Sequence, residues 1–154
     1  MATETHSNKF SITGNRLYKA EKLCSTAAVS RMFAAGHSFI VYPLRVVYID
    51  NPKPLSQQAP AVRFMITIPK KRVRRAVKRV LLRRRVREAY RLNRNLITPA
   101  LDSCGLHADM AFIYLDSTPA PYSKIEERMQ EALTRVAEAL TTTASDNDTQ
   151  PSNE

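Results

Sequence analysis

The chain has 154 residues, of which 24 are Lys or Arg and 14 are Asp or Glu, giving a formal net charge of +10. With 44% hydrophobic residues it can bury the core of one domain. Its three glycines stand apart, which excludes P-loop and dinucleotide-binding folds, because those folds need a Gly-rich phosphate cradle. We therefore expect no nucleotide cofactor. No apolar run approaches the roughly 20 residues of a membrane span, so we expect a cytoplasmic protein that does not bind membranes.

The two ends of the chain differ in composition from the part between them. Residues 1–9 and 142–154 are polar and lack periodicity, so we predict disordered tails flanking a single domain over residues 10–141. Cys24 and Cys104 lack CxxC spacing and the three histidines are scattered. These residues indicate neither a disulfide scaffold nor a metal site, and the two cysteines are expected to be buried free thiols.

A helix and then a divided strand are predicted in the first third of the domain. Leu23, Ala27, Met32 and Phe33 share one helical face, and Gly36 is placed to end that helix. The run from Phe39 to Ile49 is rich in β-branched and aromatic residues, which favours a strand that Pro43 splits or confines to an edge. Three prolines in residues 51–60 indicate a loop.

Two further strands and a closing helix follow. Residues 62–68 alternate apolar and other side chains until Pro69, which predicts a strand with one buried face. Residues 110–115 are continuously apolar, as in a central strand covered on both faces. Ser123 and Glu126 have the spacing of a capping box that opens the last helix. The apolar residues at helical spacing in that helix are Ile125, Met129, Leu133, Val136 and Leu140.

The remaining element, residues 70–94, carries most of the charge. It holds 13 of the 24 basic residues, ten of them Arg, against a single acid, Glu88, so its net charge is +12 and the rest of the chain carries −2. It is free of Gly and Pro and predicts a helix from Arg72 to Leu92. The element order is αββ(β)αβα, which places the fold in the α+β class as a small two-layer α/β sandwich.

This basic helix has two contrasting faces. At 100° per residue, Val80, Arg84, Arg87 and Arg91 form a stripe flanked by Arg83 and Arg94. The opposite face carries Leu82, Val86, Ala89 and Tyr90, which can pack on a sheet. A helix face that only needs to be soluble usually mixes acidic with basic residues, and here acids are nearly absent. A membrane-binding helix needs an exposed apolar face, whereas the apolar face of this helix is needed for the core. Because Arg binds phosphate bidentately and stacks on bases, the pattern favours a nucleic acid partner.

The order of residues in this segment resembles the protein subunit of bacterial ribonuclease P. The resemblance lies in Lys70-Lys71, Ala76-Val77-Lys78-Arg79, Arg83-Arg84 and Arg87-Glu88-Ala89-Tyr90-Arg91, all following a strand. It extends to Arg16-Leu17, Met32-Phe33, Gly36 and the strand from Arg45 to Ile49. One departure is that Val80 and Leu81 stand where the family usually has Asn and Arg. We hypothesise that Arg72, Arg74, Arg75 and Arg85 compensate electrostatically.

The resemblance implies a fold and a set of RNA contacts. It implies a left-handed crossover from strand through basic helix to parallel strand, against the usual right-handed rule. It also implies that the basic helix binds the catalytic RNA of ribonuclease P. The RNA-binding residues carried over are Lys70, Lys71, Lys78, Arg79, Arg83, Arg84, Arg87 and Arg91. A cleft between the first helix and the sheet would hold the 5′ leader of precursor tRNA, with Val29, Phe33 and Tyr48 facing it. Phe33 and Tyr48 are equally consistent with core packing.

No catalytic side chains are predicted. The ordered chain has no paired carboxylates or His cluster, and Asp102, Asp109 and Asp116 are expected to be caps or solvated charges. The resemblance implies that the RNA is the catalyst and holds Mg²⁺, so the protein supplies no metal ligand. Two alternatives remain: a ribosomal or other structural RNA-binding protein without a role in cleavage, and a metal-dependent nuclease, which the missing carboxylate cluster disfavours.

Overall fold

The computed structural model describes residues 16–50 and 60–147. The predicted tail at residues 1–9 and nearly all of the predicted 51–60 loop lie outside these ranges. Four strands form one mixed sheet in the order β1-β2-β4-β3. They are β1 (His37–Val41), β2 (Leu44–Asp50), β3 (Val62–Thr67) and β4 (Ala108–Tyr114). β4 pairs with β2 antiparallel and with β3 parallel.

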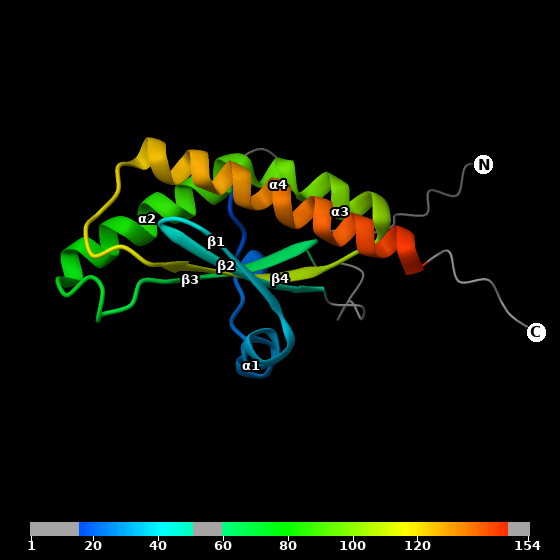
Figure 1. The fold of residues 1–154 in the computed structure, drawn as a ribbon, viewed down its shortest axis with the longest axis horizontal. Helices are drawn as coiled ribbons and strands as arrows, with labels where there is room; N and C mark the ends of the chain where they lie inside the picture. Colours follow the sequence, from blue (N-terminus) through cyan, green and yellow to red (C-terminus); the bar gives the residue numbers. More distant parts are fainter. Residues whose placement is uncertain (1–15, 51–59, 148–154) are drawn as a thin grey trace, which may run out of the picture.

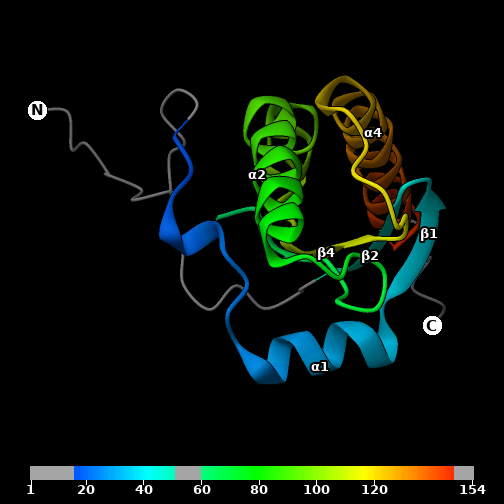
Figure 2. The same cartoon turned by 90° about the vertical axis from the view of Figure 1, so that its left-hand side faces the viewer.

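The helices lie on both faces of this sheet. The two long ones, α2 (Ala76–Asn93) and α4 (Tyr122–Asn147), lie side by side on one face, and α1 (Thr26–Ala35) crosses the other (Figures 1 and 2). A short helix α3 (Thr98–Cys104) and two 3-10 turns, η1 (Lys19–Glu21) and η2 (Arg94–Leu96), complete the chain. The predicted α+β class and the order of strands and helices are therefore confirmed. The sheet is covered on both faces, because α1 packs on the face opposite α2 and α4, and α3 is an addition. The chain crosses from β3 through α2 and α3 to the parallel strand β4. That this crossover is left-handed stays a prediction.

The strand predictions hold in detail. Pro43 divides the early strand into β1 and β2, which pair antiparallel from His37↔Tyr48 to Val41↔Leu44. The continuously apolar segment forms β4 between β2 and β3, and all its residues but Ile113 are buried. Gly36 ends α1 at a close approach of backbones, because a Cβ atom there would lie 2.3 Å from the Met32 carbonyl oxygen. Among the described residues, Gly105 is the single glycine in the left-handed region, at φ 65°, and it ends α3.

Several helix boundaries differ from the predictions. α1 begins at Thr26, so Leu23 precedes it, and Ala27 and Phe33 are exposed rather than part of a buried face. α4 begins at Tyr122, one residue before the predicted Ser123 cap, because the Pro121 carbonyl accepts the Lys124 and Ile125 amides. It continues past residue 141 to Asn147, so the first part of the predicted C-terminal tail is helical.

Two hydrophobic clusters lie on the two faces of the sheet. The larger lies under α2 and α4 and contains the predicted apolar residues of both helices. The smaller one, under α1, combines Leu23, Met32, Val47, Ile49 and Ala111. Both cysteines are free but exposed, so the prediction of buried thiols was wrong: Cys24 lies in the extended segment before α1 and Cys104 ends α3. Within the described part of the chain no helix is long and apolar enough to cross a bilayer.

Candidate RNA interface

The buried face of α2 explains why its cations point outward. Leu82, Val86, Ala89 and Tyr90 are each 0% exposed, as the sequence pattern predicts. The Tyr90 ring packs on Phe64 of β3 at a centroid distance of 4.1 Å and on Phe112 of β4 at 6.0 Å. These contacts fix the rotation of the helix about its axis, so the opposite side faces solvent.

The predicted binding residues divide into exposed and engaged cations. The exposed ones are Lys70, Lys71, Lys78, Arg83, Arg84 and Arg87. Arg79 and Arg91 are only half-exposed and bind groups of the protein itself. We call the exposed set, together with Arg72, Arg74 and Arg75 of the preceding turn, the cationic face. It extends from the end of β3 along the outer side of α2.

A tight turn, rather than helix, precedes α2. The predicted start at Arg72 was wrong, because the Pro69 carbonyl accepts the amides of Arg72 and Val73 and turns the buried Val73 side chain into the core. Arg79 holds this turn: its Nη1 donates to the carbonyls of Val73 at 3.0 Å and Arg74 at 2.7 Å. Arg79 therefore has a structural role beside any RNA contact.

The far end of the predicted cationic stripe also differs from expectation. Arg94 is buried, 3% exposed, and its Nη1 binds both carboxylate oxygens of Glu21 at 2.8 and 2.7 Å. Its Nη2 donates to the Arg16 carbonyl, and Glu21 accepts the Tyr18 amide at 2.8 Å. Arg94 is thus absent from the solvent-exposed cationic side of the helix, and it attaches residues 16–21 to the end of α2. The two residues are 73 positions apart in the sequence, which gave no signal for this pair.

Contacts made by Glu88 and Arg85 reduce the positive charge that α2 presents to solvent. Arg91 donates from Nε to the Glu88 carboxylate at 2.9 Å, and this hydrogen bond lowers the pKa of Glu88, which stays ionised at neutral pH and offsets part of the Arg91 charge. Arg85 donates to the Ala120 carbonyl at 2.6 Å. Arg85 is therefore less able to compensate for Val80 and Leu81, because its guanidinium group is bound within the protein. Arg72, Arg74 and Arg75 are exposed and fit that role better.

Two grooves border the cationic face. A groove of about 480 Å³ follows the outer side of α2 and is lined by Leu17, Arg84, Arg85, Arg87, Glu88, Arg91 and Tyr122. A second one, of about 200 Å³, lies between α2 and the edge of the sheet and is lined by Lys22, Leu23, Cys24, Phe64, Met65, Ile66, Arg83 and Arg87. Arg87 belongs to both, so the two grooves adjoin.

The residues of the predicted leader cleft do not share one face of the sheet. Val29 packs against the smaller cluster under α1, and Phe33, one turn later, is 49% exposed. Tyr48 instead packs against the larger cluster, beside His37 and Phe39 of β1. Alternation along β2 puts Val47 and Ile49 toward α1 and Tyr48 toward α4. Placing Tyr48 in the cleft was therefore wrong, and it lines a separate pocket with residues of α4.

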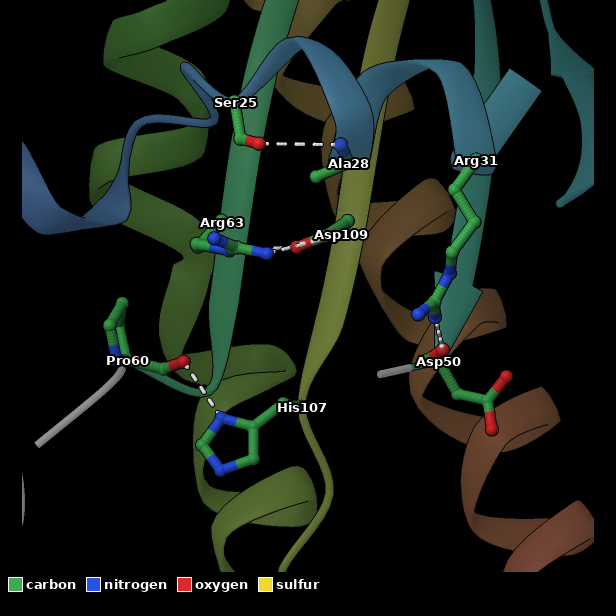
Figure 3. A network of polar contacts seen from close by, with 8 residues as sticks. All are labelled: Ser25, Ala28, Arg31, Asp50, Pro60, Arg63, His107 and Asp109. Atoms are coloured by element: carbon green, nitrogen blue, oxygen red, sulfur yellow. Dashed lines mark hydrogen bonds and ion pairs between the residues drawn. The ribbon is translucent and has the colours of Figure 1, made fainter. Parts of the chain in front are cut away.

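The α1 side of the sheet carries partners that the sequence analysis missed. Arg63 of β3 and Asp109 of β4 lie opposite each other in register and form a two-pronged ion pair at 2.9 and 3.1 Å (Figure 3). Asp109, 3% exposed, is thus neither a cap nor a solvated charge. Arg31 of α1 donates to the Asp50 carbonyl at 2.8 Å and anchors the helix (Figure 3). Met65 and Ile113, also on this side, are partly exposed.

The described carboxylates are dispersed and mostly engaged. Glu21, Glu88 and Asp109 each pair with an arginine, and Asp116 accepts the Ser117 and Thr118 amides. Asp116 thus stabilises the turn after β4 rather than capping a helix, and Asp102 is exposed on α3, as a solvated charge would be. Within the described ranges no three His, Cys, Asp or Glu side chains gather as a metal site would require.

The geometry defines a small basic α+β protein with one cationic helix face. The family model described as Ribonuclease P matches residues 17–137. The Ribonuclease P protein component of Porphyromonas gingivalis strain ATCC 33277 is 37% identical over 121 residues, 79% of this chain and 86% of that protein. That of Chlorobaculum tepidum is 40% identical over 89 residues, 56% of each chain. The chain belongs to the ribonuclease P protein family.

Solved structures share the fold. The RNase P protein of Staphylococcus aureus superposes with a TM-score of 0.59 at 21% identity, covering 78% of this chain and 97% of that one. The RNase P protein of Thermotoga maritima gives 0.59 at 21% identity and covers 75% and 96%. The resemblance drawn from the basic segment is therefore confirmed at the level of family and of fold.

Replacing Arg79 by Ala is expected to loosen the turn before α2. Two charge-assisted hydrogen bonds are lost, each worth about 1.5 to 3 kcal/mol, so local opening becomes easier. We expect the amides of Arg72 and Val73 to exchange with deuterium at least about tenfold faster, measured by NMR. Arg83→Ala, an exposed cation on the same helix, is the control and should leave these rates unchanged. Equal exchange in both variants would show that Arg79 does not hold the turn.

Proposed function

We propose that this chain is the protein subunit of the ribonuclease P ribonucleoprotein, the endonuclease that removes the 5′ leader from precursor tRNA. The observation that carries the proposal is the cationic face, a dense and nearly acid-free surface on a helix whose other side is buried. Membership of the ribonuclease P protein family supports it further. The partners are then the catalytic RNA and precursor tRNA.

In this role the protein acts through electrostatics. Lys and Arg neutralise phosphates that would otherwise repel one another where RNA strands crowd together, and their binding releases condensed counterions. The guanidinium groups of Arg83, Arg84 and Arg87 are exposed donors for phosphate oxygens. Cleavage and Mg²⁺ binding are assigned to the RNA component.

The leader is assigned to the α1 side of the sheet. Leader sequences vary, so their site needs apolar surface rather than base-specific groups. Val29 and Phe33 on α1, with Met65 and Ile113 on the sheet, offer such a surface. The groove between β3 and α2 shares Met65 with it and Arg87 with the cationic face. One substrate can thereby contact both sides of β3.

The test is reconstitution with precursor tRNA at low Mg²⁺, with and without the ribonuclease P RNA encoded in the same genome. Cleavage that needs both components is the expected result, because the protein supplies phosphate neutralisation and the RNA supplies catalysis. Cleavage by the protein alone would identify a nuclease. Binding without stimulation of cleavage would leave a structural RNA-binding protein.

Replacing Arg84 and Arg87 together by Ala is expected to weaken binding to that RNA by a few kcal/mol, since each charge-assisted contact is worth about 1.5 to 3. The wild-type log K should fall with log salt at a slope of roughly −4 to −5 if about six phosphates are contacted, and the variant slope should be shallower by about two. Filter binding over a salt series measures both values. A wild-type slope near zero would contradict the cationic face as the contact surface, and unfolding of the variant would contradict the assigned solvent side.

Phe33→Ala is expected to weaken holoenzyme binding to precursor tRNA roughly tenfold, because stacking on a base is worth about 1 to 3 kcal/mol. Binding to mature tRNA, which lacks the leader, should not change. Tyr48→Leu is the control, since it removes an aromatic ring on the opposite face of the sheet while keeping an apolar side chain. A leader-dependent loss in Tyr48→Leu with none in Phe33→Ala would reverse the assignment of faces.

A further inference from the structure

Three apolar side chains interrupt the cationic face in the first turns of α2. Val77, Val80 and Leu81 have exposed fractions of 81%, 48% and 40%. Residues spaced by three and four are neighbours on a helix surface, with Cβ atoms about 5–6 Å apart, so these three form one apolar patch. The core does not need them, because Leu82 and Val86 already fill the buried side of the same turns.

The surroundings of the apolar patch make it unusual. Scattered apolar residues are ordinary on protein surfaces. Here, however, every other exposed side chain in the segment from residue 70 to 87, except Ala76, is Lys or Arg. A helix of this kind would gain solubility from polar residues at these positions. Three adjacent aliphatic side chains among cations therefore indicate a ligand with both an apolar part and negative charge.

Cations border the apolar patch closely. Arg84 is three residues beyond Leu81 and four beyond Val80, and helical side chains lean toward the N-terminus, so Arg84 leans over the edge of the patch. Arg74 and Arg75, both exposed, precede the helix on the other side. The next acid along α2 is Glu88, which is bonded to Arg91.

The size of the apolar patch argues against a protein partner. A stable protein interface buries about 800 Å² on each side, far more than a triangle of three aliphatic side chains supplies. The flat face of one nucleobase matches that triangle, and the phosphates on either side of a nucleotide match the bordering cations. Paired bases are stacked within a helix, so only an unpaired base can present its face.

We propose that the apolar patch binds the face of one unpaired nucleobase of the RNA partner, while Arg84 and the cations before the helix bind the adjacent phosphates. This inference rests on the proposed function and adds a contact at positions 80 and 81, where the family usually has polar residues. In this chain, the interaction at these two positions is aliphatic contact with a base.

The test compares the full-length chain with the variant Val80→Thr/Leu81→Asn, which keeps similar side-chain volumes but removes the apolar surface. Binding to the ribonuclease P RNA of the same genome is measured over a salt series. We expect about a tenfold loss of affinity at every salt concentration with an unchanged slope, since no charge is lost. Arg84→Ala should instead lower both the affinity and the magnitude of the slope, the latter by about one. Leu92→Asn is the matched control, an exposed apolar residue of α2 outside the patch, and should bind like the wild type.

A second readout locates the base. In the wild-type complex we expect an unpaired adenine or cytosine of the RNA to be protected from dimethyl sulfate, and the double variant at saturating concentration should release it. Val77→Thr, at the most exposed position of the patch, should weaken the same protection without affecting the fold. Unchanged affinity and protection in both variants would overturn the proposal.

The outcomes separate this proposal from the proposed function. Failure of the wild-type chain to bind the RNA would count against the function itself. Normal RNA binding by the double variant, together with lost self-association in sedimentation, would assign the apolar patch to a second copy of the chain and overturn the nucleobase proposal alone.

Discussion

The packing of α2 on the sheet is the contact on which the rest of the structure depends. Tyr90 lies between Phe64 and Phe112, one on each of the two parallel strands, and aromatic pairs of this kind add about 0.5 to 1.5 kcal/mol beyond their buried area. Together with Leu82 and Val86 they set the rotation of the helix. Burial of this face is what concentrates nine exposed Lys and Arg residues of the helix and its preceding turn on one surface of the molecule.

Contacts within the protein hold the two ends of the basic segment in place against the repulsion between its charges. Like charges repel within the cationic face, yet the turn before α2 keeps a defined shape because Arg79 binds two of its carbonyls. At the other end Arg94 and Glu21 form a buried ion pair, and removing one partner of such a pair costs about 3 to 5 kcal/mol. Some arginines of the basic segment thus hold the fold, so that the others can present their charge to solvent.

In the proposed function, the two faces of the sheet support two different binding surfaces. The side under α2 and α4 supports the surface assigned to the catalytic RNA, and the side under α1 supports the surface assigned to the leader. The Arg63–Asp109 pair couples the parallel strands β3 and β4 on the α1 side, where an apolar pair would have enlarged the small cluster. The groove at the edge of β3 joins the two surfaces, since Arg87 and Met65 both line it.

The sequence by itself determined the types of the four strands and of α1, α2 and α4, the buried face of α2 and the family, because these follow from local periodicity and from the order of residues along one helix. It could not reveal which arginines are exposed. Arg79 and Arg94 have the same side chain as Arg84, and only their contacts with groups outside α2 distinguish them. Tyr48 likewise belongs to an aromatic-rich strand, but which face it occupies depends on the register between β1, β2 and β4 and on which helix covers each side. Tertiary structure decided these points, because they arise from contacts between elements, which the periodicity of one helix or strand does not encode.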